Sequence, residues 1–190
     1  MRKLVVFENV TVDGYFADKN GDLSWAHKPA DSADFNKFVQ ENASSSDGGV
    51  LLFGRITYQM MVSYWPTSAA LRDQPEVATG MNRAPKVVFS RTLDAARWEN
   101  TALVKGDLPA EVRKLKQAEG GQITILGSGS IVSQLTKAEL IDEYDLVVNP
   151  VILGEGRKLF EGVMDKVDLK LVSTRSFTNG NVLLTYIRPG

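Results

Sequence analysis

The chain has 190 residues, of which 43% are hydrophobic and 24% charged, a balance that is ordinary for a globular protein. Lys and Arg number 22 against 23 Asp and Glu, so the net charge of -1 gives no support for binding to nucleic acid or to an anionic membrane. There is no Cys and a single His, His27, which excludes disulfides, thiolate nucleophiles and the common Cys-based or His-x-x-x-His metal sites.

The length favours one domain, residues 1–190, that is large enough to bury a full core. The apolar run Leu4 to Phe7 is stopped by Glu8, so it is too short for a signal peptide or a membrane span. We expect a cytoplasmic protein without a bound metal.

The first half of the chain predicts two strands and two helices. A Val- and Phe-rich strand comes first and runs into a turn at Asp13-Gly14. An amphipathic helix follows, with Asp31 or Ser32 as its cap, and then a buried strand leads through a glycine into a second helix that Trp65-Pro66 ends. The predicted ranges are Lys3–Thr11 and Val50–Phe53 for the strands and Asp31–Asn42 and Gln59–Tyr64 for the helices.

The second half continues this alternation and ends in a hairpin. We expect a loop with at most one helical turn over Thr67–Pro85, and Asn179-Gly180 between two strand-like runs is a strong hairpin signal. The alternation predicts an α/β domain with a mostly parallel sheet and antiparallel strands at one edge. The remaining predicted strands are Lys86–Phe89, Ala102–Lys105, Gln122–Leu126, Glu143–Val151, Leu169–Phe177 and Val182–Arg188, with helices at Pro109–Ala118 and from Ile131.

One stretch carries most of the functional signal: the strand Gln122–Leu126 turns into a helix through Gly127-Ser128-Gly129-Ser130. The first N–H groups of such a helix have no partner and form an anion site, which glycine lets a phosphate approach closely. The alternative is a plain strand-to-helix turn with Ser128 or Ser130 as N-cap. The third glycine of a Rossmann fingerprint is missing, because Val132 stands there.

Two other predicted strands also end in small or basic residues: Gly54-Arg55-Ile56-Thr57 and Ser90-Arg91-Thr92. In an open α/β sheet, ligands bind beyond the carboxyl ends of the strands, so these three ends can surround one ligand. Helix N-termini suit a pyrophosphate and arginines suit a further phosphate, which together point to NADP. For each arginine taken alone, the alternative is an ordinary solvated surface charge.

The pattern resembles the dihydrofolate reductase-like superfamily, in particular stand-alone relatives of the reductase domain of the bifunctional riboflavin-biosynthesis deaminase–reductase. The resemblance covers nearly the whole chain. It rests on Val12-Asp13-Gly14-Tyr15-Phe16-Ala17, Trp25, Phe53-Gly54-Arg55-Ile56-Thr57-Tyr58, Val88-Phe89-Ser90, Ile125 to Ser130, and Asn149 to Phe160.

The resemblance implies an NADPH-dependent reductase that is often a homodimer, with a dihydrofolate reductase-like fold. It implies that the pyrophosphate lies on Gly54-Arg55-Ile56-Thr57 and Gly127-Ser128-Gly129-Ser130, and that Ser90-Arg91-Thr92 lies at the adenosine 2′-phosphate. The departures are on the substrate side: Tyr15 stands where the riboflavin reductases tend to carry Lys, and the zinc deaminase domain is absent.

Asp13 is the candidate proton donor, because it follows the first strand; an ordinary Asp-Gly turn is the alternative. Trp25 and Trp65 are candidate walls of the substrate pocket or else plain core. By the resemblance, Asp31 and Asp34 lie in the segment where dihydrofolate reductases carry the acid that engages the pterin. Acids at a helix start usually serve as caps, which is the role expected for Asp31, so Asp34 is the candidate. The functional hypothesis is that the protein reduces 5-amino-6-(5-phosphoribosylamino)uracil. The alternatives are dihydrofolate reduction and a non-catalytic module that binds NADP or a flavin.

Overall fold

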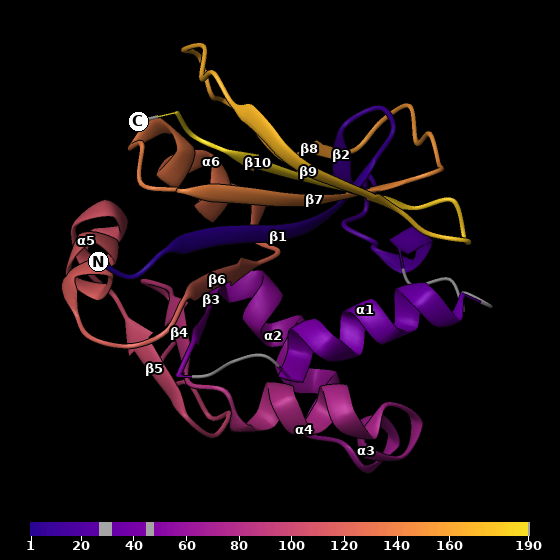
Figure 1. Ribbon diagram of the computed structural model, residues 1–190. Helices are drawn as coiled ribbons and strands as arrows, with labels where there is room; N and C mark the ends of the chain where they lie inside the picture. Colours follow the sequence, from indigo (N-terminus) through magenta and orange to yellow (C-terminus); the bar gives the residue numbers. More distant parts are fainter. Residues whose placement is uncertain (27–31, 45–47, 190) are drawn as a thin grey trace.

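The computed structural model describes residues 1–26, 32–44 and 48–189 (Figure 1). Strands and helices alternate through most of the chain, and the last two strands form a hairpin. The strands are β1 Leu4–Thr11, β2 Tyr15–Ala17, β3 Val50–Gly54, β4 Lys86–Phe89, β5 Thr101–Val104, β6 Ile123–Leu126, β7 Glu143–Asn149, β8 Arg157–Lys158, β9 Lys170–Ser176 and β10 Val182–Ile187. The helices are α1 Ala33–Ser44, α2 Arg55–Tyr64, α3 Ser68–Asp73, α4 Pro75–Arg83, α5 Leu108–Gln117 and α6 Gly129–Lys137, with a 3₁₀ turn at Ser24–Ala26.

The main sheet has eight strands in the order β5-β4-β3-β6-β1-β7-β10-β9. The first six run parallel to their neighbours, whereas β10 is antiparallel to β7 and β9 is antiparallel to β10. A separate pair, β2 and β8, lies beside it. The predicted α/β class, with a mostly parallel sheet and an antiparallel edge, is confirmed.

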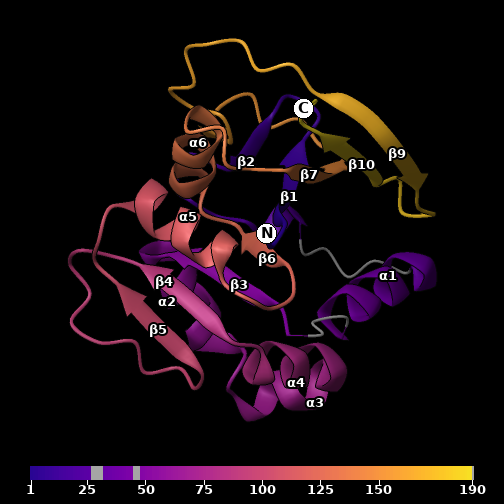
Figure 2. The same ribbon diagram turned by 60° about the vertical axis from the view of Figure 1, so that its left-hand side comes forward.

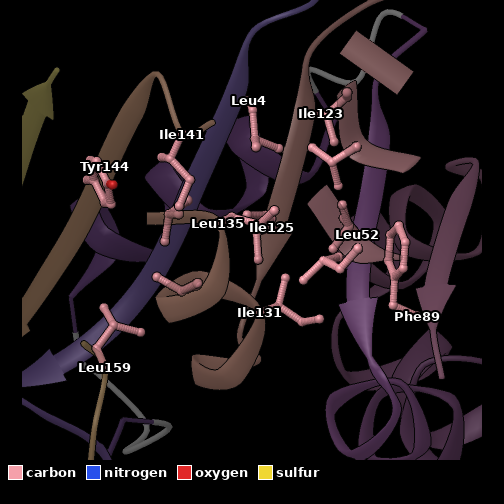
Figure 3. Close-up of a cluster of buried hydrophobic side chains, with 14 of the residues drawn as sticks. Leu4, Leu52, Phe89, Ile123, Ile125, Ile131, Leu135, Ile141, Tyr144 and Leu159 are labelled. Atoms are coloured by element: carbon pink, nitrogen blue, oxygen red, sulfur yellow. The ribbon is translucent and has the colours of Figure 1, made fainter. Parts of the chain in front are cut away.

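Helices cover both faces of the sheet, because its strands are apolar on both sides. On one face, α5 and α6 pack onto Leu4, Leu52 and Ile125, and Figure 3 shows Ile131 and Leu135 of α6 in this cluster. On the other face, α2 and α4 pack around Phe53 and Val88, and α1 packs through Phe38. Figure 2 shows the two groups of helices on opposite sides of the sheet.

The loop predicted over Thr67–Pro85 is wrong, because α3 and α4 fill this segment. The Thr67 side chain caps α3 by accepting a hydrogen bond from the Ala70 N–H, and Pro75 occupies the first turn of α4. Pro is tolerated there because the first N–H groups of a helix have no partner within it. Val77 and Met81 face the core, so packing decides the structure of this segment.

The closing hairpin is confirmed. Phe177 N–H donates to the Asn181 carbonyl at 2.9 Å, and Gly180 has φ of +87°, a conformation that glycine adopts without strain. The helix predicted from Asp31 begins at Ala33, after Ser32; Asp31 and His27 lie outside the described residues. Over the described ranges, no helix combines the length and the apolar character needed to cross a bilayer.

Candidate functional site

Three strand ends lie side by side at the carboxyl edge of the parallel sheet. Gly54 at the end of β3 pairs with Phe89 at the end of β4. On the other side of β3, Leu52 pairs with Ile125 of β6, so the end of β6 reaches the same level as Gly54. The segments after β3, β4 and β6 therefore start from three adjacent strands.

Ser128 links two of these junctions. Its hydroxyl accepts a hydrogen bond from Gly54 N–H at 2.7 Å and donates one to Thr57 Oγ1 at 2.8 Å. Ser128 stands at the N-cap position of α6 with φ of 71°, in the left-handed region, and its side chain makes no capping bond. The alternative of a Ser128 side-chain cap is therefore wrong, and Ser130 already lies within the helix.

The first turns of α2 and α6 both lack a side-chain cap. By contrast, α3 and α5 begin with capping side chains, from Thr67 and Asp107. Uncapped N–H groups at the positive end of a helix dipole attract anions. The two helices that start at the carboxyl edge of the sheet thus provide adjoining positions for negative groups.

The glycines of this region are needed for close packing as well as for access. A Cβ on Gly127, where φ is +61°, would lie 2.9 Å from Thr57 Cγ2. A Cβ on Gly129 would lie 2.4 Å from the Phe16 ring. A larger residue at Gly129 would therefore displace Phe16, so this position is unsuited to a clean test of ligand binding.

The third junction is more open. The Ser90 hydroxyl accepts hydrogen bonds from Thr92 N–H at 3.2 Å and Leu93 N–H at 2.9 Å, so it shapes its own turn. Arg91 is exposed next to it. Arg55, at the start of α2, is also exposed and donates to Gln59 Oε1 at 2.9 Å. Both guanidinium groups are accessible at the edge of the sheet where the junctions meet.

A cavity of about 350 Å³ adjoins the junctions. Thr57, Gly127 and Ser128 line it, and so does Trp65, one of the two candidate walls of the substrate pocket. Trp25 is half-buried outside the lining, and its indole N–H is buried without a partner among the described residues.

Asp34 does not line the cavity. Its carboxylate accepts hydrogen bonds from the Ser32 hydroxyl at 2.5 Å and from the Thr178 hydroxyl and N–H at 2.7 and 3.1 Å. These donors, Ser32 first, lower the pKa of Asp34. The residue joins the start of α1 to the hairpin turn, and this geometry supplies no support for pterin binding.

Asp13 is held in a similar way. Its carboxylate accepts the Thr11 hydroxyl at 2.5 Å and Gly154 N–H at 2.8 Å, together with Leu153 N–H. The Thr11 hydroxyl, followed by these amides, holds the pKa of Asp13 below its usual value. A carboxylate stabilised in its charged form is a poor proton donor, so the geometry favours the turn alternative, and the catalytic role of Asp13 stays a prediction.

Glu8 is a site residue that the sequence analysis missed. It lines the cavity, is only 7% exposed, and its Oε2 has no partner among the described residues. Burial raises the pKa of its carboxyl to about 8. Its position follows from the register: Phe7 pairs with Leu126, so Glu8 lies level with Gly127 where β6 leaves the sheet. The sequence contains a signal for this position. Glu8 falls on the same face of the strand as Leu4, Val6 and Val10, two residues apart along the chain, and all of these residues are buried.

Comparisons with known proteins agree with this architecture. The chain is 31% identical over 97% of its length to "Uncharacterized protein YyaP" of Bacillus subtilis and covers 94% of that protein. The crystal structure of "Putative riboflavin biosynthesis protein" from Shewanella sp. PV-4 matches with a TM-score of 0.74 and 26% identity, covering 99% of both chains.

Two more distant structures share the fold. The diaminohydroxyphosphoribosylaminopyrimidine deaminase/5-amino-6-(5-phosphoribosylamino)uracil reductase of Thermotoga maritima has a TM-score of 0.67 and 18% identity; the match covers 99% of this chain and 57% of that one. Dihydrofolate reductase from Enterococcus faecalis, complexed with NADP(H), has a TM-score of 0.65 and 16% identity, with 99% and 97% covered. The family model of the RibD C-terminal domain matches residues 2–183. The chain belongs to the RibD C-terminal domain family and has a dihydrofolate reductase-like fold.

Proposed function

We propose that the protein is an NADPH-dependent reductase of a small ring compound. The observation that carries the proposal is the pair of uncapped helix N-termini, of α2 and α6, that the Ser128 hydroxyl holds together at the carboxyl edge of the sheet. Two adjoining anion positions suit a pyrophosphate. Membership of a reductase domain family adds independent support.

The residues present fit such a cofactor. The N–H groups that begin α2 and α6 would hold the pyrophosphate, and Arg91, with Arg55 nearby, would pair with the adenosine 2′-phosphate. Because β4, β3, β6 and β1 are consecutive in the sheet, a dinucleotide with its adenosine over β4 would direct its other end toward β1 and Glu8. When bound, the reduced cofactor supplies a hydride, and the protein's task is to align the acceptor with it.

The sequence suggests 5-amino-6-(5-phosphoribosylamino)uracil as the substrate. This hypothesis gains support from the family and from the name of the Thermotoga maritima relative. Dihydrofolate reduction has less support, because the Asp34 carboxylate is bonded to Ser32 and Thr178. Oxidation of NADPH by a defined acceptor would separate a reductase from a non-catalytic NADP-binding module.

A charge placed at the α6 N-terminus tests the proposal. Ser130 is exposed in the first turn of α6, so Ser130→Asp should leave the fold intact and repel the pyrophosphate. Loss of one charge-assisted contact and added repulsion should weaken NADPH binding about 10–100-fold, as measured by calorimetry.

The matched control is Ser68→Asp, which places the same charge at the exposed start of α3, beyond the far end of α2. It should bind NADPH as the unmodified protein does. Equal affinity in Ser130→Asp and Ser68→Asp would remove the α6 N-terminus from the site.

A further inference from the structure

The cavity continues from the junctions along one face of α2. Thr57, Met61 and Trp65 all line it, and they are spaced four residues apart, so they lie on the same side of the helix. Eight residues of α-helix span about 12 Å. The cavity therefore extends about 12 Å along α2 from the Thr57–Ser128 junction, and on the other side of that junction it reaches Glu8 and Phe16.

This extension is apolar and adaptable. Met60, Met61 and Met81 line it together with Trp65, whose indole N–H contacts Met61 Sδ at 3.1 Å. Methionine side chains are flexible and polarisable, and they pack well against flat rings. Trp65 adds a rigid aromatic surface. The volume of about 350 Å³ is sufficient for a compound of one or two rings.

The described lining residues offer no positive charge to an anion. Among the described residues that line the cavity, none is Lys or Arg, whereas Glu8 and Asp145 are acids. Burial raises the pKa of both carboxyls, which favours their neutral forms. A phosphate in this space would lose its hydration, and none of the described lining residues supplies a cation to replace it.

We propose that the cavity beside α2 binds an uncharged, mostly apolar ring compound that carries no phosphate, and that this compound class is the substrate of the reductase. The proposal rests on the proposed function in one respect: the cofactor is taken to bind at the Thr57–Ser128 junction, beside the cavity. It departs from the phosphoribosylamino-uracil named for the Thermotoga maritima relative, since that compound carries a phosphate group.

A pair of probes that differ only in the phosphate tests this. 1-Naphthol and 1-naphthyl phosphate are titrated by calorimetry into the full chain saturated with NADP⁺, which blocks the helix N-termini as phosphate sites. The neutral probe should bind at least about tenfold more tightly, because the phosphate pays an uncompensated desolvation cost. Equal or tighter binding of the phosphate, or no binding of either probe, would overturn the proposal.

A variant that supplies the missing cation gives the second arm. Met60 lines the cavity and is 38% exposed, so Met60→Arg should be tolerated and should raise the affinity for 1-naphthyl phosphate about tenfold. Met164→Arg is the control, because Met164 is 89% exposed and outside the lining. An unchanged phosphate affinity in Met60→Arg would show that the probes bind elsewhere.

The two proposals fail separately. If NADP⁺ does not bind, the cofactor assignment is lost, but 1-naphthol titrated into the protein alone still decides whether the cavity takes a neutral ring. If NADP⁺ binds and 1-naphthol does not, the cofactor assignment stands and the substrate class proposed for the cavity falls.

Discussion

Glu8 illustrates how one residue couples the fold to pH. Its carboxyl lies in the middle of β1 and is kept neutral by burial, which raises its pKa from 4.5 to about 8. Between those two values the folded protein keeps a proton that the unfolded chain releases. The contribution of Glu8 to the free energy of unfolding is therefore largest below about pH 4.5. It decreases as the pH rises, and it becomes constant above about pH 8.

Glu8→Gln should remove this dependence, because an amide does not titrate. We expect the stability of the variant relative to the unmodified protein to increase between pH 5 and pH 8, by up to about 1.4 kcal/mol per pH unit. Urea unfolding at several pH values measures it, with Glu119→Gln, at an exposed position, as control. Parallel pH profiles for Glu8→Gln and the unmodified protein would show that Glu8 is ionised in the folded state.

Acids also show the limit of sequence reasoning about single residues. Asp13 was singled out because it follows the first strand, and Asp34 because dihydrofolate reductases carry an acid on the first helix; both lie at those places in the fold. Their roles depend on partners about 140 residues away, Gly154 and Thr178, which no local pattern reveals. Spacing along the chain therefore locates a side chain but does not give its hydrogen-bond partners.

At the scale of elements, the strand–glycine–helix junctions were predictable and α4 was not. The junctions follow from local chemistry, because small residues at a strand end allow a helix to start at once. In α4 the apolar positions lie between Pro75, Gly80 and Pro85, which read as loop residues. What stabilises the helix is packing of Val77 and Met81 against Phe53 and Val88 of other elements. Its C-terminal end is also held by the following strand, because Lys86 Nζ, buried on β4, donates to the carbonyls of Met81, Asn82 and Ala84 at 2.6–3.1 Å.

The link between α2 and α6 can be tested at Ser128. Ser128→Ala would leave the buried Gly54 N–H and the Thr57 hydroxyl without the partner they have now. An unpaired buried group costs about 1–3 kcal/mol, so the free energy of unfolding should fall by that amount. Urea unfolding measures it against Ser63→Ala, an exposed position on α2. A loss no larger than in the control would mean that water replaces the hydroxyl.

At the scale of the whole molecule, the parallel sheet was predictable because it follows from the alternation of strands and helices, whereas the strand order depends on long-range pairing.

One edge of that sheet, formed by β9 and its neighbour β10, is unusually exposed. All seven residues of β9 are exposed, and the six of its inner neighbour β10 are only partly buried. In Figure 2 the β9–β10 pair projects from one side of the molecule. An open strand edge offers unpaired N–H and C=O groups to a second chain.

We propose that the protein forms a homodimer, with β9 and β10 in the interface. Sedimentation velocity at micromolar concentration should then give twice the chain mass of 20.9 kDa. Leu171→Lys, at a half-exposed apolar position on β9, should shift the protein toward the monomer. A single species of 20.9 kDa for the unmodified protein would rule the dimer out.

The central claim is that the carboxyl edge of the sheet binds NADP(H), and a calorimetric comparison of NADPH with NADH tests it most directly. NADH lacks the 2′-phosphate that Arg91 would hold, so we expect NADPH to bind more tightly, and Arg91→Ala to weaken NADPH alone by about 10–100-fold. Arg113→Ala, at an exposed position on α5, should change neither affinity. Absence of NADPH binding, or an equal loss of both cofactors in Arg91→Ala, would contradict the account.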